Sequence, residues 1–306
     1  MAQEQIWDGS TDGDWSTGAN WESGNAPGNG DSVRIPAGVT QGIDGYDASG
    51  TTLVGFTVEN TSITIGSKTT PLHITLYDSS TAYDAILEGT GETHLQIDDY
   101  ENIVVRDAAT SPGTGEYGLN LSGALDDTNT PAASGNIIIL AGANASIGLG
   151  SEAGTDLELN DLKVTGGSVT VGSSVTEDDG STAPDMSMTG GTAETHSALG
   201  TVSQTGGTWR HHSGAVTTMN VDGGKCHYRS TGTASTVTVA NSGQVLCTED
   251  IRGRTFSALT MYSGATFKDP MESVTLTNDI DLTRCGLSDV TLELGNHIKL
   301  SRGEIT

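Results

Sequence analysis

The chain of 306 residues contains few aromatic side chains, few basic residues and no long apolar run. Aromatic residues make up 5% of the chain, so its core has to be built in thin layers from Val, Ile, Leu, Thr and Ala. No long segment places apolar residues at positions i, i+3, i+4 and i+7, which argues against a framework of amphipathic helices. No stretch of about 18 apolar residues is present, so the sequence predicts no membrane-spanning helix.

Basic residues are especially scarce beside acidic ones. Lys and Arg number 13 against 39 Asp and Glu, which gives a formal net charge of −26. Such a surface repels phosphate backbones and anionic bilayers, so we expect neither nucleic-acid nor membrane partners. It favours metal cations or a positively charged partner protein. Adaptation to salty surroundings is the alternative interpretation of the acidic composition.

Cysteine is rare, and a secretory leader is not evident. Cys226, Cys247 and Cys285 are an odd number at unrelated spacings, so the sequence indicates no disulfide framework and we expect inward-facing thiols. The first residues lack a basic segment followed by an apolar one. We therefore expect either that a leader has been removed or that the protein is made in a cytoplasm and reaches its site by assembly.

What the chain does contain is a short repeated phrase of alternating apolar residues around a Gly-Gly step. Clear copies occupy residues 162–171, 186–193, 202–209 and 219–226, and looser copies occupy 237–246, 259–267, 274–282 and 292–300. The doublets are Gly166 and Gly167, Gly190 and Gly191, Gly206 and Gly207, and Gly223 and Gly224. A repeat of this kind is typical of a stacked architecture.

The spacing of the doublets sets the size of one turn of that stack, which we call a rung. A rung of about 16 residues holds two or three short strands, and period-2 alternation turns one face of each strand inward. A Gly-Gly step supplies the positive φ that lets the chain turn a corner. The sequence therefore predicts an all-β fold, a parallel β-helix or β-solenoid, in which equivalent residues of successive rungs align into ladders.

Three regions are distinguished along the chain. Residues 1–36 hold Trp7, Trp15 and Trp21, and we expect these rings to cover the open end of the solenoid as an N-terminal cap. Residues 37–156 form a β-rich section that is either an irregular solenoid or resembles a β-sandwich, with long loops at 107–118 and 126–135. Strands are predicted there and just before it at 33–35, 53–58, 62–65, 72–76, 94–97, 102–105 and 136–140. Residues 157–306 form the short-rung solenoid.

The N-terminal segment resembles a motif found at the start of β-helical surface and virion proteins. The pattern runs Trp-x-Gly, Trp, Ala-Asn-Trp and Gly-x-x-Pro-x-x-Gly-Asp-x-Val-x-Ile. Here it comprises Trp7, Gly9, Trp15, Ala19, Asn20, Trp21, Gly24, Pro27, Gly30, Asp31, Val33 and Ile35. The resemblance implies a cap leading into a parallel β-helix, as in bacterial autotransporter-type adhesins and in phage decoration, head-fibre and tail-spike proteins. Without an evident leader, it favours the virion proteins.

Two groups of residues are candidate metal ligands. Asp8, Asp12 and Asp14 lie among glycines and offer oxygen ligands for Ca²⁺, although acidic turns are common in this chain and the spacing is not that of an EF-hand. His196 and His212 each follow the second Gly of a doublet by five residues, so we expect them to stack on adjacent rungs. With His211 and His227 they would bind a transition metal, line a threefold axis, or form a plain polar ladder.

The same region holds candidate residues for saccharide binding. Trp209, Arg210, Tyr228, Arg229 and Tyr262 are candidates for a sugar-binding face. Glycoside cleavage needs paired carboxylates, and Glu194 has no evident acidic partner at the matching place on the next rung. We therefore expect no enzyme activity and no cofactor other than a candidate Ca²⁺.

The sequence thus favours a non-enzymatic phage virion protein, a capsid decoration or fibre component that forms a homotrimer. Its partners would be other copies of itself and other virion proteins such as the major capsid protein, with a cell-surface glycan as a further candidate. It would be made in the host cytoplasm and located on the virion. The alternatives are a secreted bacterial adhesin located at the cell surface and a polysaccharide-degrading tailspike.

Overall fold

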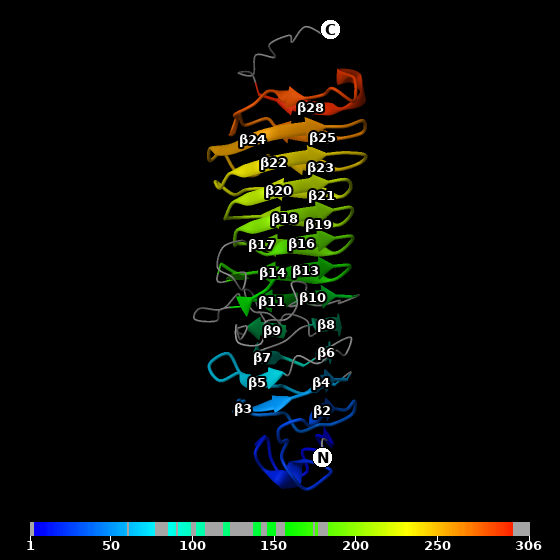
Figure 1. The fold of residues 1–306 in the computed structure, drawn as a ribbon, viewed down its shortest axis with the longest axis vertical. Helices are drawn as coiled ribbons and strands as arrows, with labels where there is room; N and C mark the ends of the chain where they lie inside the picture. Colours follow the sequence, from blue (N-terminus) through cyan, green and yellow to red (C-terminus); the bar gives the residue numbers. More distant parts are fainter. Residues whose placement is uncertain are drawn as a thin grey trace.

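The chain forms an elongated stack of short strands in a computed structural model (Figure 1). The structure describes residues 3–59, 61–76, 85–89, 91–98, 102–107, 119–122, 137–141, 146–150, 157–173, 175–176 and 183–295. In these residues the only helices are the 3-10 turns η1 (Gly18–Asn20) and η2 (Leu287–Asp289). No helix in the described ranges has the length and apolar character needed to cross a membrane. The all-β prediction is confirmed.

The first of two long sheets has 14 strands among the described residues, and every printed pairing in it is parallel. It contains β1 (Glu4–Ile6), β2 (Ser32–Ile35), β4 (Gly55–Val58), β6 (Ala85–Glu88), β8 (Asn102–Asp107), β10 (Ile137–Leu140), β13 (Asp161–Val164), β16 (Asp185–Met188), β18 (Leu199–Gln204), β20 (Val216–Val221), β22 (Ala234–Val239), β24 (Arg254–Met261), β26 (Val274–Leu276) and β27 (Ile280–Asp281). From β2 to β25, apart from β12 and β15, successive strands of the chain alternate between this sheet and a second one, which makes the arrangement solenoid-like.

The second sheet has 12 strands in the described part and is also parallel. It contains β3 (Asp47–Leu53), β5 (Leu72–Leu76), β7 (Thr93–Asp98), β9 (Leu119–Ser122), β11 (Ser146–Leu149), β14 (Ser168–Val171), β17 (Thr192–Thr195), β19 (Thr208–His211), β21 (Lys225–Tyr228), β23 (Gln244–Leu246), β25 (Thr266–Asp269) and β28 (Thr291–Leu294). A two-stranded sheet joins β12 (Leu157–Glu158) to β15 (Val175–Thr176).

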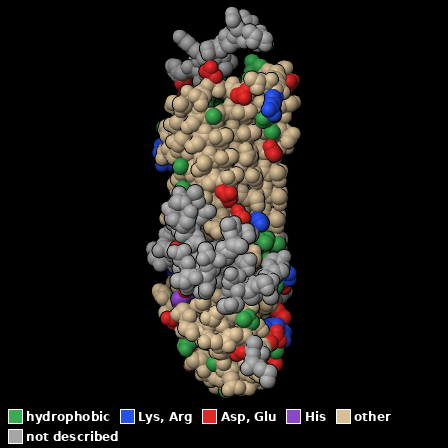
Figure 2. Space-filling view, viewed as in Figure 1, with side chains coloured by type: hydrophobic (Ala, Val, Ile, Leu, Met, Phe, Trp, Pro, Cys, Tyr) green, Lys and Arg blue, Asp and Glu red, His purple; other side chains and the backbone are tan. Residues whose placement is uncertain are grey.

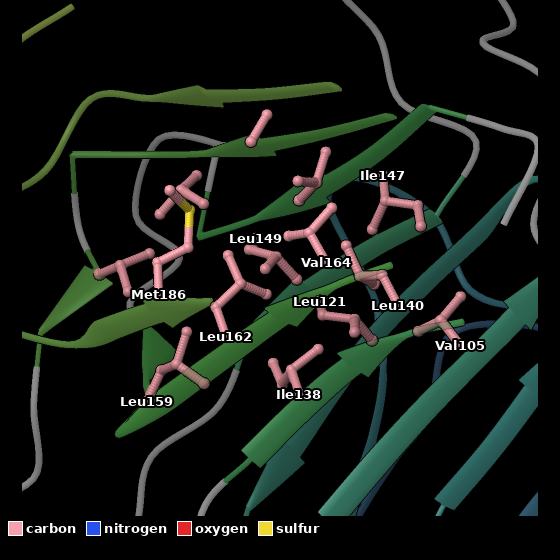
Figure 3. Close-up of a cluster of buried hydrophobic side chains, with 14 of the residues drawn as sticks. Val105, Leu121, Ile138, Leu140, Ile147, Leu149, Leu159, Leu162, Val164 and Met186 are labelled. Carbon is pink, nitrogen blue, oxygen red and sulfur yellow. The ribbon is translucent and has the colours of Figure 1, made fainter. Parts of the chain in front are cut away.

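Alternating residues of both sheets form one continuous core. Figure 3 shows its middle, where Leu162 and Val164 of β13 lie among Ile138, Leu140 and Leu149 of neighbouring strands. In the C-terminal half the core column of the second sheet runs through Ala193, Trp209 and Cys226, all fully buried. The small Ala193 and Cys226 on either side of Trp209 in this column leave room for its indole ring.

The positive φ predicted for the Gly-Gly corners is confirmed, and the two glycines of a doublet are needed for different reasons. The second glycine has positive φ where the doublet is described, with values of 69° at Gly167, 73° at Gly191, 72° at Gly207 and 74° at Gly224. The first glycine is required by close approach: a Cβ at Gly206 would lie 2.3 Å from the carbonyl oxygen of Thr189. Successive corners therefore stack backbone on backbone, leaving no room for a side chain.

The middle of the chain continues the same two sheets. The described strands from β3 to β11 all pair in parallel with strands of those sheets, with register shifts between Ala48 and Thr52 and between Leu87 and Glu88. Of the two alternatives for residues 37–156, these strands favour an irregular solenoid. Most of the predicted loops at 107–118 and 126–135 lies outside the described residues.

Most predicted strands are present, and one is wrong. Residues 72–76 match β5, and the predictions at 33–35, 94–97, 102–105 and 136–140 fall on β2, β7, β8 and β10. Residues 53–58 divide between β3 and β4. Residues 62–65 form no strand, because only Ile65 makes isolated bridges, to Ile43 and Thr93. The last predicted repeat, 292–300, overlaps β28 and then leaves the described part of the chain.

The three N-terminal tryptophans are buried and pack edge to face. Trp7 and Trp21 have ring centroids 5.1 Å apart at 77°, and Trp15 and Trp21 have centroids 4.8 Å apart at 84°. The indole N–H of Trp21 donates to the Trp15 carbonyl at 2.9 Å, and that of Trp7 donates to the Gln41 carbonyl at 3.2 Å. Both polar atoms are therefore satisfied while the rings join the core.

Candidate functional site: the outer face of the second sheet

The second sheet carries an outward-facing ladder of charged residues in its C-terminal half. Strand pairing brings equivalent outward positions side by side on successive rungs, at Thr170, Glu194, Arg210, His227, Leu246, Lys268 and Glu293. The intervening positions point inward. The ladder arises because a parallel, in-register stack repeats one side-chain position at every rung.

The predicted stacking of His196 and His212 is confirmed. Both residues directly follow the ends of paired strands, β17 and β19, and the His212 amide donates to the Thr195 carbonyl at 2.8 Å. Their rings lie parallel, with centroids 4.5 Å apart and 7° between planes. Burial lowers the pKa of His212, and the neighbouring His196 lowers it further, so the His212 imidazole is neutral near pH 7.

Glu194 completes a compact group with the two histidines. One donor atom from each of Glu194, His196 and His212 lies within 4.8 Å of the others, and this is the only such group of three or more potential metal ligands among the described residues. Glu194 Oε2 lies 3.6 Å from His212 Nε2, while Oε1 lies 3.7 Å from Arg210 Nη1. The carboxylate thus divides its two oxygens between a histidine and an arginine.

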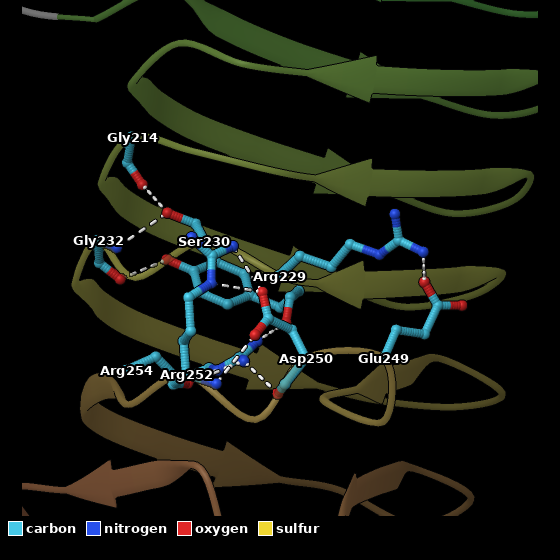
Figure 4. Close-up of polar contacts among 9 residues, drawn as sticks. Gly214, Arg229, Ser230, Gly232, Glu249, Asp250, Arg252 and Arg254 are labelled. Carbon is cyan, nitrogen blue, oxygen red and sulfur yellow. Dashed lines mark hydrogen bonds and ion pairs between the residues drawn. The ribbon is translucent and has the colours of Figure 1, made fainter.

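A second ionic group lies one to two rungs further on. Glu249 pairs with His227, whose Nδ1 is 2.8 Å from Glu249 Oε1, and with the guanidinium of Arg229 (Figure 4). Burial opposes ionisation of Glu249, but the interactions with His227 and with the Arg229 guanidinium hold the pKa of this carboxyl below its usual range. Of the alternatives for the four histidines, a metal site made by all four is not assembled, because His227 pairs with Glu249 and His211 points inward.

His211 belongs to a buried network of hydrogen bonds. The Trp209 indole N–H donates to Thr195 Oγ1 at 2.9 Å, and Thr195 Oγ1 lies 2.8 Å from His211 Nδ1. His211 Nε2 lies 3.0 Å from the Gly214 carbonyl, which can only accept, so this nitrogen carries the proton. Nδ1 then accepts from the threonine hydroxyl. His211 is a satisfied core residue and not a metal ligand.

The proposed sugar-binding face is wrong. Trp209 and Tyr228 are fully buried, and the Tyr228 hydroxyl donates to the Gly232 carbonyl at 2.8 Å inside a corner. Of the candidates here, Arg210 is an outward position of β19, and Arg229 directly follows β21 and is partly exposed. Tyr262 sits two rungs away, with the Arg284 guanidinium carbon 5.7 Å from its ring centroid. No aromatic platform is formed from these residues.

The candidate calcium ligands Asp8, Asp12 and Asp14 are not gathered into a site. Each uses a carboxylate oxygen to accept a backbone N–H two residues along, from Ser10, Asp14 and Ser16. The bond from the Ser16 amide, with a second from the Ser16 hydroxyl, lowers the pKa of Asp14. The observed role of the three aspartates is therefore to close successive turns beside Trp15.

Two buried ionisable residues have no signal in the sequence. The Arg254 side chain is almost fully buried and donates to the carbonyl oxygens of Asp250 at 2.6 Å, of Arg252 and of Tyr228 (Figure 4). Asp269 accepts from the amide and hydroxyl of Ser273 and from the amide of Val274. Both residues hold irregular corners together, and their polar atoms have hydrogen-bond partners, as buried polar groups require.

The cysteines form no disulfide. Cys226 and Cys247 are fully buried, as predicted, and burial raises the pKa of both thiols, that of Cys247 to about 12. Cys285 is only partly buried, because η2 and the strands around it lie at the exposed end of the described stack. Neither buried thiol is a nucleophile at neutral pH.

The first sheet presents a different outer face in the same half. On β18, β20, β22 and β24 the outward side chains are small and uncharged, namely Thr201, Ser203, Thr217, Thr218, Asn220, Ser235, Thr236, Thr238, Thr255, Ser257, Ala258 and Thr260. We call these residues the neutral face. Figure 2, which views the molecule as in Figure 1, shows few charged side chains over much of the C-terminal half.

Comparison with known proteins adds no identification: no family model, curated protein or solved structure matches the chain.

Proposed function

We propose that this protein is a non-enzymatic structural component of a phage virion, a capsid decoration or fibre protein that assembles with other copies of itself as a trimer. The observation that carries the self-assembly is the neutral face. The virion assignment is supported by the Trp-x-Gly to Gly-Asp-x-Val-x-Ile segment at the N-terminus and by the solenoid-like stack into which that segment leads.

The neutral face is significant because the rest of the chain is strongly acidic. Copies with a formal net charge of −26 repel one another, most strongly where acidic side chains approach. Four adjacent strands of the first sheet, β18, β20, β22 and β24, carry no outward ionisable side chain within the fully described range 183–295. Association through this face brings no like charges into contact and allows threonine and serine hydroxyls to bond across the interface.

The finer fold proposal concerns the N-terminal residues 1–36, which we propose to be a cap. β1 lies at one edge of the first sheet, and Trp7, Trp15 and Trp21 pack beside it. An uncovered solenoid end exposes backbone groups and core side chains, and a cap removes both liabilities. In an assembled particle the cap would also prevent unwanted end-to-end polymerisation.

The test of self-assembly is the mass of the protein in solution. Light scattering and sedimentation over a range of concentrations should give three times the chain mass of 31.4 kDa. Replacing Thr218 and Thr236, which are register partners, by Glu places two charges in the neutral face and should shift the protein to monomer. The matched control, Gln244→Glu with Thr266→Glu, adds the same charge to register partners on the second sheet and should leave the trimer intact.

A monomer at every concentration would overturn the self-assembly, as would a face variant with the wild-type mass. The virion assignment has its own measurement, because mass spectrometry of purified particles from a phage carrying this gene should find the chain in stoichiometric amount. Its absence from particles, together with antibody labelling of bacterial surfaces, would favour the adhesin alternative instead.

A further inference from the structure

The stacked histidines and Glu194 form a group whose ring stacking and long ion pairs leave one buried nitrogen without a hydrogen bond. The neighbouring histidines are already engaged elsewhere. His211 takes part in the buried hydrogen-bond network with Thr195 and Gly214, and His227 is paired with Glu249. His212 Nε2 and His227 Nδ1 are both shielded from solvent and make no well-directed hydrogen bond within the described residues. His227 Nδ1 still has a Glu249 oxygen at 2.8 Å, whereas the Glu194 oxygen beside His212 Nε2 lies 3.6 Å away. A buried polar atom without a hydrogen-bond partner is costly unless something binds it.

The separation of the donor atoms fits a shared ion better than a hydrogen bond. Glu194 Oε2 and His212 Nε2 are 3.6 Å apart, which is too long for a charge-assisted hydrogen bond. Two ligands of one tetrahedral zinc ion, each with a bond of about 2.0 to 2.2 Å, lie about 3.4 Å apart. The distance between Glu194 Oε2 and His212 Nε2 is therefore close to that between two ligands of one zinc ion. The donor atom of His196 lies within 4.8 Å of both residues' donor atoms.

The chemistry of the group also suits such an ion. Two imidazoles and one carboxylate are ligands that Zn²⁺ accepts, and three protein ligands leave a fourth position for water or another donor. Both imidazoles must be neutral to bind the ion. On binding, the parallel ring planes would have to diverge so that both lone pairs point at one ion.

Other charged groups around the site set its strength. Arg210 Nη1 lies 3.7 Å from Glu194 Oε1 and opposes a cation, and Arg229 lies near enough to disfavour a charged His212. Arg229 is itself neutralised by Glu249. The Glu194 oxygen that faces His212 is the one that Arg210 does not contact, so a metal need not displace the arginine.

We propose that Glu194, His196 and His212 bind a Zn²⁺-class divalent ion that clips the β17 rung to the β19 rung. The ligands come from two successive turns of the stack, so the ion would join rungs that are otherwise held by backbone hydrogen bonds and core packing. This site is independent of the proposed virion role.

The test uses the whole chain, freed of metal by chelation and titrated calorimetrically with ZnCl₂ at pH 7.5. One ion per chain should bind. His212→Ala and His196→Ala should each weaken binding at least about 10-fold, and Glu194→Gln should do so while keeping the side-chain shape. His227→Ala, a histidine of the same sheet outside the group, should bind as the wild type does.

Two further readouts guard against unspecific binding. Co²⁺ bound at the site should show the intense visible absorption of four-coordinate cobalt, and Zn²⁺ should raise the melting temperature of wild type but not of Glu194→Gln. Circular dichroism checks that each variant is folded. If a histidine variant is unfolded, the comparison of wild type with Glu194→Gln alone tests the proposed metal site. Equal affinity in wild type and Glu194→Gln, or equal loss in His227→Ala, would overturn the proposal.

Discussion

At the residue scale, the corner glycines differ in what they tolerate. Gly207 has a φ of 72°, and a Cβ there would lie 2.6 Å from the Gly191 carbonyl oxygen of the previous corner. Gly253 has no left-handed φ, and no atom lies within 4 Å of the place its Cβ would take. The doublets therefore have a backbone requirement, whereas Gly253 has none.

We predict that Gly207→Ala lowers the free energy of unfolding by about 2 kcal/mol or more, because it combines a left-handed backbone with a steric clash. Gly253→Ala should leave it unchanged or raise it slightly, since alanine restricts the unfolded chain. Chemical denaturation of the two variants beside wild type measures both effects. Equal behaviour of the two variants would show that the corners can relax.

At the element scale, the alternation of the strands and the Gly-Gly corners could be predicted from the sequence, and the irregular corners held by Arg254 and Asp269 could not. The phrase apolar–x–apolar–x–Gly–Gly–x–apolar–x–apolar predicts β13 with β14 and the pairs that follow. The same phrase aligns Trp209 with Val169, Ala193 and Cys226, all inward, and this alignment was the available signal against a sugar-binding face. Arg254 gave no such signal, because its partners are carbonyl oxygens whose positions depend on the folded corner.

The candidate metal-binding group of Glu194, His196 and His212 was partly predictable from the spacing of the repeats. Equal spacing from two doublets predicts that His196 and His212 stack, and they do. The pairing of His227 with Glu249 could not be predicted, because it depends on how the chain after β23 folds back toward β21. Period-2 alternation would have separated His211 from His212, since neighbouring residues on a strand face opposite sides.

The network around His211 leads to a prediction about pH. Burial, chiefly, lowers the pKa of His211 to about 4, while the Gly214 carbonyl opposes the shift. Below pH 6.5 the unfolded chain takes up a proton that the folded state refuses until about pH 4, so stability falls as the pH is lowered through this window. Between pH 7 and 5, wild type should lose about 2 kcal/mol more than His211→Gln.

Denaturation curves of wild type and His211→Gln at both pH values measure that difference. The comparison cancels the carboxylates and the other histidines, which the two proteins share. Parallel losses in the two proteins would mean that His211 is protonated in the folded state, which would contradict its donation to the Gly214 carbonyl alone.

At the scale of the whole molecule, a stack of rungs has a stability that varies along its length, since each rung contacts only its neighbours. In the middle of the C-terminal half, Val216, Met219 and Val221 of β20 are fully buried. On β28 no residue is buried, and Leu292 and Leu294 pack only partly against the core. The described solenoid therefore has a firmly packed interior and a loosely packed C-terminal rung.

Native-state hydrogen exchange should reveal this gradient directly. Amides of β20 and β22 each lie between two strands, so their opening requires several rungs to separate, whereas β28 has only β25 beside it in the described sheet. We expect β28 amides to exchange at least about 100-fold faster than those of β20, with β25 intermediate. The Trp-containing N-terminal segment should be protected although it lies at the opposite end, because its three indole rings are buried where β28 has none. Uniform exchange from β1 to β28 would instead show one cooperative unit, and rapid exchange of the Trp7 and Trp21 amides would argue against a cap.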